Sequence, residues 1–244
     1  MHHVVLDRWS RGTSPLHRRD ARAKVIVLMV FLAVLATTQH ALLWLAPALF
    51  LLLAGALLWA RLPLAGALAR AALVVPFTGV FALISWFAGD PARGVSLMVK
   101  SYLSALAVLL IVSTTPLPSL LRGFEMTGAP RFLLVVGQFL YRYLFLISEE
   151  AQHMSKAAAA RGATARDWMA PGLRFRAAAG ALGVLFARSF ARAEQIHRAM
   201  LARGFQGHFQ PLEAAQFRPS DAAFTVLASL ATVALRIAAE IASR

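Results

Sequence analysis

Two Glu-x-x-His motifs are the residues in this sequence whose types and spacing could hold a metal. Glu150 and His153 form one motif, and Glu194 and His197 form the other. In helical bundles, two such motifs and one glutamate from each of two further helices bind a pair of iron ions. The remaining glutamates that could complete this site are scattered: Glu125, Glu213 and Glu240. A membrane-bound di-iron oxidase is therefore the alternative, and polar residues on two exposed helix faces are the simpler interpretation.

Motifs of other enzyme and cofactor sites are absent from the sequence. The start of the chain, Met1-His2-His3, could bind a metal through its imidazoles, but a histidine pair on a terminus usually has no such role. The sequence has no G-x-x-x-x-G-K-[ST] loop, G-x-S-x-G elbow, H-E-x-x-H helix or dinucleotide fingerprint. We therefore expect a non-catalytic protein that has no cofactor and does not itself bind ATP through such a loop.

The tripeptide Ala-Arg-Gly occurs at residues 160–162 and again at 202–204, at the ends of two predicted long helices. A glycine after the last helical residue and an arginine in the final turn are ordinary features of a helix end. The tripeptide also occurs at residues 92–94, in a predicted loop. The matching positions of Arg161 and Arg203 nevertheless suggest that each could enter an acidic pocket of a partner through its forked guanidinium. The candidate site residues are Ala160, Arg161, Gly162, Ala202, Arg203 and Gly204.

Two long helices must position these arginines. The spacing of apolar residues predicts one helix over about 131–160 and another over about 175–202. The apolar face of the first contains Leu140, Tyr143, Leu144, Ile147, Met154 and Ala158, and that of the second contains Leu182, Leu185, Phe186, Ala193, Ile196 and Met200. Amphipathic helices with basic faces suit a membrane interface or a partner groove. Two helices packed on each other beside a solvated arginine stripe would show the same pattern, so both interpretations stay open.

Composition predicts that the rest of the chain lies in a membrane. Of its 244 residues, 59% are hydrophobic and 15% are charged, and the mean hydropathy is +0.64. Soluble domains have about 45–50% apolar and about 25% charged residues. The net charge of +14 comes from arginine-rich blocks between apolar stretches, which is typical of membrane proteins rather than of nucleic-acid-binding proteins. The absence of cysteine excludes disulfides and Cys-ligated metals.

The apolar stretches predict an all-α polytopic membrane protein with about five transmembrane helices. About 20 apolar residues cross the hydrocarbon core of a bilayer. The polar residues 37–40 divide the first apolar block, and the Gly- and Pro-containing segments 89–91 and 116–118 end two later ones. The expected transmembrane helices are 22–38, 41–60, 71–88, 95–115 and 222–241.

Charge decides the orientation of the chain and the assignment of the apolar stretch 132–147. The arm before the first helix is rich in Arg and Lys, so we expect it in the cytoplasm. If 132–147 crossed the membrane, the arginines after it would lie outside, and Arg142 would be buried in lipid at a cost of roughly 2.5–3.5 kcal/mol. We therefore interpret 132–147 as the start of a cytoplasmic helix. The predicted organisation is a cytoplasmic arm at 1–24, transmembrane helices 1–4 at 25–116, a cytoplasmic coupling domain at 117–219 and a last transmembrane helix at 220–244.

Several short motifs, in this order and spacing, resemble those of the transmembrane T components of energy-coupling factor (ECF) transporters. Residues 14–24, Ser-Pro-Leu-His-Arg-Arg-Asp-Ala-Arg-Ala-Lys, are similar to the family's arm S-x-L-H-R-L-D-P-R-x-K, from which Arg19 and Ala21 depart. The stretch 114–130, which begins Thr-Thr-Pro, is also similar. Further similar motifs are Tyr141-Arg142-Tyr143, Glu149-Glu150 and the two Ala-Arg-Gly ends. The sequence is most similar to the CbiQ/NikQ branch of the family, which serves cobalt and nickel.

The resemblance implies a scaffold and energy-coupling role in an ABC-type importer. It implies two ABC-type ATPase subunits that bind the ATP, a CbiM-like substrate-binding membrane subunit, and room for a small accessory membrane subunit. Arg161 and Arg203 would couple to the ATPases, and Gly162 and Gly204 would shape the turns. ATP-driven closure of the ATPases would move the helices and tilt the substrate subunit.

The resemblance also implies a location and a substrate. The chain would be a multi-pass protein of the prokaryotic cytoplasmic (inner) membrane with a cytoplasmic N-terminus, in contact with the lipid bilayer and not with nucleic acid. Cobalt is the expected substrate, and nickel and vitamin importers are the alternatives within the family. A stand-alone secondary carrier is disfavoured because intramembrane charges and inverted repeats are lacking.

Overall fold

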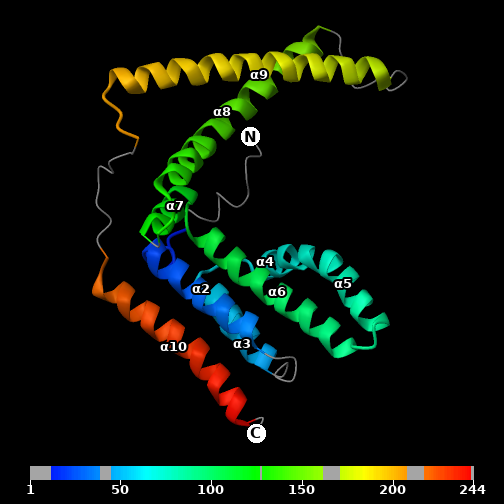
Figure 1. Cartoon of the computed structure of the whole chain (residues 1–244), viewed down its shortest axis with the longest axis vertical. Helices are drawn as coiled ribbons and strands as arrows, with labels where there is room; N and C mark the ends of the chain where they lie inside the picture. The colour runs from blue at the N-terminus through cyan, green and yellow to red at the C-terminus, as the bar shows by residue number, and fades with distance from the viewer. Residues whose placement is uncertain (1–11, 39–44, 127, 162–170, 208–216, 243–244) are drawn as a thin grey trace. The chain divides into compact units, whose positions relative to one another are not determined.

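The computed structural model describes the chain except for residues 1–11, 39–44, 127, 162–170, 208–216 and 243–244. Every regular element in the described part is a helix (Figure 1), which confirms the predicted all-α class. The chain divides into two compact units. The first comprises Met1–Gly128 and Glu213–Arg244, and the second comprises Ala129–Leu212.

The first unit contains most of the helices. Its elements are α2 (Ala21–Thr37), α3 (Ala46–Trp59), α4 (Leu64–Ala71), the 3₁₀ turn η2 (Ala72–Val74), α5 (Val75–Phe87), α6 (Pro91–Thr114), α7 (Leu117–Met126) and α10 (Pro219–Ala242). Asp20 begins α2 as an N-cap, since its Oδ1 accepts a hydrogen bond of 2.8 Å from the backbone N–H of Arg22. The second unit contains α8 (Arg131–Ala160) and α9 (Pro171–Ala202).

The central helix of the first unit is α6, which contacts α2, α3, α4 and α5. Its residue Leu106 is fully buried in a cluster that includes Leu49 and Leu57 of α3. Helix α10 packs against α2 and α3, and α5 and α6 form a hairpin (Figure 1). By contrast α5 has no buried residue, and Phe77 and Phe87 are 69% and 87% exposed. Such an apolar outer surface is stable only in contact with lipid or a partner.

Within the described residues, four helical stretches are long and apolar enough to cross a bilayer. They are Leu64–Phe87, Pro91–Thr114, Phe132–Ala160 and Pro219–Ile241, and Ala46–Trp59 is a shorter apolar helix. The stretch Phe132–Ala160 contains the segment 132–147 discussed above and qualifies by length and composition. The assignment of 132–147 to the cytoplasm rests on charge and stays a prediction.

The third predicted span begins earlier than the expected residue 71. Its helix starts at Leu64 and is interrupted by η2 before α5 continues to Phe87. Pro76 explains the interruption, because proline lacks the N–H that would bond to the carbonyl of the residue four positions earlier. The sequence prediction recognised the apolar run after Arg70 and left out the helical turns before it.

Helix α7 was missed by the sequence prediction. Residues 116–118, Pro-Leu-Pro, end α6 as expected, but α7 begins within them at Leu117. A proline in the first helical turn costs no hydrogen bond, so the same residues can end one helix and begin the next. Helix α7 packs on α2, where a Cβ on Gly123 would lie 3.3 Å from the carbonyl carbon of Ala21.

Two basic side chains meet the carboxyl end of α2. Lys100 donates to the carbonyl oxygen of Thr38, and Arg236 donates to the hydroxyl and carbonyl of Thr37. These carbonyls lie at the end of α2, where they have no partner within the helix and where the helix dipole is negative.

Candidate functional site

The second unit is a pair of helices with almost no buried core. Helices α8 and α9 contact each other, yet Leu134 is the only buried apolar side chain among the described residues of this unit. Phe132 and Phe186 are each 73% exposed, and Leu140 is 63% exposed. A contiguous exposed apolar surface of this kind marks a contact with protein or membrane. The helix pair therefore has the surface of a binding element.

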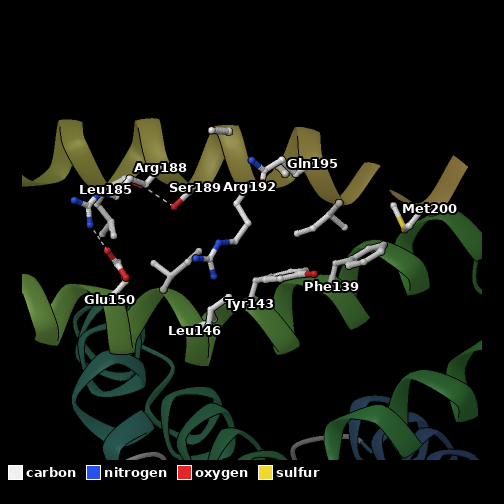
Figure 2. Close-up of a pocket in the computed structure, with 14 residues that line it drawn as sticks. Phe139, Tyr143, Leu146, Glu150, Leu185, Arg188, Ser189, Arg192, Gln195 and Met200 are labelled. Carbon is white, nitrogen blue, oxygen red and sulfur yellow. Dashed lines mark hydrogen bonds and ion pairs between the residues drawn. The ribbon is translucent and has the colours of Figure 1, made fainter. Parts of the chain in front are cut away.

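A groove of about 600 Å³ lies between α8 and α9. The helices run antiparallel along it, because Phe139 faces Met200 at one end and Glu150 faces Arg188 at the other (Figure 2). Most of the lining side chains are apolar, and Arg192 extends from α9 across the middle of the groove (Figure 2). Such a groove can receive an apolar helix face that also offers an acceptor to the guanidinium.

An ion pair between Glu150 and Arg188 joins the two helices at one end of this groove. Glu150 is the glutamate of the first Glu-x-x-His motif, so its carboxylate is already paired with an arginine. The second, Glu194, pairs with Arg198 on its own helix at 3.4 Å, and His153 lies 3.9 Å from Glu149. In the part of the chain that the structure describes, no group of three or more metal-ligating side chains comes together. The geometry therefore gives the di-iron alternative no support, and Met1-His2-His3 and Glu213 lie outside the described residues.

The first Ala-Arg-Gly ends α8. Ala160 is the last helical residue, and the backbone N–H of Arg161 bonds to the carbonyls of Ala157 and Ala158 at 3.2 and 3.1 Å. The side chains of both residues are exposed. Gly162 lies outside the described residues, so its predicted role in the turn stays a prediction.

The second Ala-Arg-Gly ends α9 in a complete Schellman motif. Gly204 has φ +73°, its N–H bonds to Leu201 O at 3.0 Å, and the N–H of Phe205 bonds to Met200 O at 3.0 Å. This pair of bonds satisfies carbonyls that the helix end would leave unpaired, and it needs a residue in the left-handed conformation that glycine adopts freely. The predicted glycine stop after Ala202 and Arg203 is confirmed.

Arg161 and Arg203 are thus two exposed arginines at two helix ends. Among the described residues, neither guanidinium forms an ion pair. The carboxyl ends of α8 and α9 lie at separate ends of the helix pair (Figure 1). The arrangement can therefore present two forked cations to two separate acidic pockets, and it does not bring both cations to one ligand.

The structure joins the other two sequence motifs within the first unit. Lys24 of the arm motif is 1% exposed, and its Nζ donates to the carbonyl of Thr114 and the hydroxyl of Thr115, each at 2.9 Å. Ser14 and His17 close a turn through an Oγ–Nδ1 contact of 2.6 Å. These motifs therefore fix where the arm, α2 and the end of α6 meet.

Sequence reasoning missed the contacts of Lys24 and of Arg188. Lys24 was counted only among the basic residues of the cytoplasmic arm, and its place at the start of an apolar run is the one local hint of burial. Arg188 belongs to the basic face of the second long helix, and the structure pairs it with Glu150 of the first. Both contacts join residues far apart in sequence, which local spacing does not report.

Comparison with known proteins places this arrangement among transporter components. A family described as "CbiQ: Cobalt transport protein" matches residues 12–212. The chain is 30% identical over 173 residues to the cobalt transport protein CbiQ of Rhodobacter capsulatus, which covers 66% of this chain and 68% of that protein. It is 28% identical over 233 residues to the energy-coupling factor transporter transmembrane protein EcfT of Bacillus selenitireducens, covering 84% of each. A protein of the same name from Acidaminococcus fermentans is 28% identical over 231 residues, also covering 84% of each.

Proposed function

Because the chain belongs to the CbiQ family and is the T component of an energy-coupling factor transporter, we propose that it transmits ATP-driven motion to a substrate-binding membrane subunit of a cobalt importer. One observation supports the coupling role most directly. The second unit has an exposed apolar groove and one exposed arginine at each of its two helix ends. A surface of this kind needs partners to cover it.

The proposed ATPase contacts are the two Ala-Arg-Gly ends. Arg161 and Arg203 would each form a charge-assisted, forked hydrogen bond with a carboxylate of one ATPase subunit. Because the two arginines lie at separate ends of the helix pair, they suit contacts with two ATPase subunits better than contacts with a single subunit. Ala160 and Ala202 leave room beside each arginine, and Gly162 and Gly204 would hold the turns.

Rigid helices would then transmit the motion. A long α-helix moves as a rod when its end is displaced, and α8 and α9 contain 30 and 32 residues. The Glu150–Arg188 ion pair joins the rods, and the groove between them can open or close as the ATPases approach each other. We propose that a CbiM-like substrate subunit rests on the apolar side chains of this pair and tilts with it.

Cobalt is the proposed substrate because the matched family and the Rhodobacter relative are both named for cobalt transport. The EcfT relatives are similar over a larger part of the chain, and their name specifies no substrate. Nickel and vitamin importers are the alternatives. We further propose the cytoplasmic membrane of a prokaryote as the location, with the N-terminus in the cytoplasm.

The test is capture of partners from native membranes by the tagged full-length chain, with mass spectrometry of the proteins retained. The wild-type chain should retain an ABC-type ATPase and a small substrate-binding membrane protein. The Arg161→Ala/Arg203→Ala variant should retain roughly tenfold less ATPase, since a lost charge-assisted pair changes an affinity by about that factor or more. Radioactive cobalt uptake by the same cells should fall in parallel.

A matched control removes two other exposed arginines of the second unit. Arg176 lies near the start of α9 and Arg198 one turn before its end, and both are exposed, so Arg176→Ala/Arg198→Ala loses the same charge and leaves both Ala-Arg-Gly ends intact. This variant should retain the ATPase as the wild type does. Equal loss in both variants would mean that total charge matters rather than the helix ends, and wild-type uptake in the Arg161/Arg203 variant would overturn the coupling proposal.

A further inference from the structure

A basic hollow of about 530 Å³ lies in the first unit, beside the arm, the end of α3 and the start of α10. Four of its lining residues are arginines, namely Arg18, Arg19, Arg61 and Arg218. The coupling proposal uses none of them. Like charges gathered around one hollow repel each other unless an anion lies between them.

The charge of the hollow is far from balanced by the described residues that line it. Asp221 is the one carboxylate among them, and it lies 3.5 Å from the Arg19 guanidinium. Arg19 is held further by the ring of Phe224, whose centroid is 5.8 Å from its Cζ. In the described part of the chain, no carboxylate forms an ion pair with Arg18, Arg61 or Arg218. The hollow therefore has cationic donors to spare.

The backbone of Arg61 is strained at this place. Arg61 follows α3 at the position of a Schellman motif where glycine is usual, since its N–H bonds to Leu58 O at 2.9 Å and the N–H of Leu62 bonds to Leu57 O at 3.1 Å. Among the described residues it is the only non-glycine residue with positive φ, at 55°. Such strain tends to persist where a side chain has a function. The Arg61 side chain is exposed and lines the hollow.

The hollow lies where several apolar helices begin or end, which is where lipid headgroups would meet them. It is lined from residues just before α2, just after α3 and at the start of α10, which are ends of apolar helices. Trp59, the last residue of α3, packs against Phe224 of α10 with 6.2 Å between ring centroids. Tryptophan is enriched at the boundary between hydrocarbon and headgroups. Basic pockets between membrane helices at this depth bind anionic lipid headgroups.

We propose that this hollow binds the phosphate group of an anionic phospholipid. Arg18, Arg61 and Arg218 would donate charge-assisted hydrogen bonds to the phosphate oxygens. Ser220, at the start of α10, adds a hydroxyl donor and the positive end of a helix dipole. The lipid would fix the arm against α3 and α10, and the proposal does not depend on the coupling function.

The test uses the full-length chain purified in detergent and titrated with two lipids that have the same short acyl chains, phosphatidylglycerol and phosphatidylcholine, with bound lipid counted by native mass spectrometry. The wild type should bind phosphatidylglycerol in preference. The Arg61→Gln/Arg218→Gln variant should bind it about tenfold more weakly. The charge-matched Arg93→Gln/Arg122→Gln variant, whose residues lie outside the hollow, should bind it like the wild type.

A single variant separates lipid binding from folding. Arg61→Gly removes the guanidinium and also relieves the strained φ, so this variant should unfold at the wild-type temperature or above while losing the lipid preference. Equal binding of the two lipids by the wild type, or an undiminished preference in Arg61→Gly and Arg61→Gln/Arg218→Gln, would overturn the proposal. Displacement of phosphatidylglycerol by the same concentration of glycerol phosphate or inorganic phosphate would overturn the lipid assignment in favour of a soluble phosphate.

Discussion

At the scale of single residues, Lys24 joins two distant stretches of the sequence. An ammonium is expensive to remove from water unless acceptors replace its hydration. The carbonyl of Thr114 and the hydroxyl of Thr115 provide two such acceptors at 2.9 Å. These two hydrogen bonds therefore favour the observed packing of the start of α2 against the end of α6. That explains why the two motifs occur together in the sequence.

Replacing Lys24 tests whether this side chain anchors the arm to the end of α6. Lys24→Met keeps the length of the side chain and removes its donors, so the Thr114 carbonyl loses a partner in a buried place. We expect the free energy of unfolding to fall by about 1–3 kcal/mol, measured as a lower midpoint of thermal unfolding in detergent. Arg122→Gln, at an exposed position of α7, should leave the midpoint unchanged. A midpoint for Lys24→Met equal to that of the wild type would contradict the anchoring role.

At the scale of elements, the end of α9 depends on the conformation of Gly204. A Cβ on this residue would meet nothing within 4 Å, but its φ of +73° strains any other residue. Gly204→Ala should therefore destabilise the last turn by roughly 1 kcal/mol. We expect faster hydrogen exchange of the amides around Phe205 and weaker capture of the ATPase.

The interior of the same helix offers the opposite substitution. Gly183 lies within α9, and a Cβ there would also meet nothing within 4 Å. Gly183→Ala should stabilise the helix by about 1 kcal/mol, because alanine restricts the unfolded backbone. Slower hydrogen exchange in Gly183→Ala together with faster hydrogen exchange in Gly204→Ala would show that an added methyl group destabilises the helix only at its end. If both variants exchanged alike, the conformation of Gly204 would not matter.

The bounds of a helix could be predicted where the residues next to its ends determine them. Helix α8 has the predicted bounds because a proline precedes it and a helix-ending Arg-Gly follows it. Helix α7 was not predicted, because Pro118 at a helix start and a proline that ends a helix look alike in sequence. The positions of Arg161 and Arg203 at helix ends were predictable from the sequence, and their coupling role stays a prediction. The Glu150–Arg188 pair and the basic hollow were not, since both depend on which helices become neighbours.

At the scale of the whole molecule, the coupling proposal depends on the side of the membrane on which α8 lies. Its apolar first half, 132–147, qualifies by length and composition as part of a span. The charge distribution opposes a crossing, since ten basic residues between 147 and the last helix would then lie outside: Lys156, Arg161, Arg166, Arg174, Arg176, Arg188, Arg192, Arg198, Arg203 and Arg218. Basic loops are retained in the cytoplasm. The coupling proposal also requires both Ala-Arg-Gly ends on the side where ATP is available.

The sequence supplies a direct way to decide, because the natural chain has no cysteine. Ala92→Cys introduces one thiol in the exposed start of α6, and Ala159→Cys introduces one at the exposed end of α8. A membrane-impermeant maleimide applied to intact cells should label Ala92→Cys and not Ala159→Cys, and permeabilised cells should label both. Each variant must retain cobalt uptake to qualify. Labelling of Ala159→Cys in intact cells would place the end of α8 outside, and neither ATPase docking at Arg161 nor the proposed transfer of motion along α8 could then be correct.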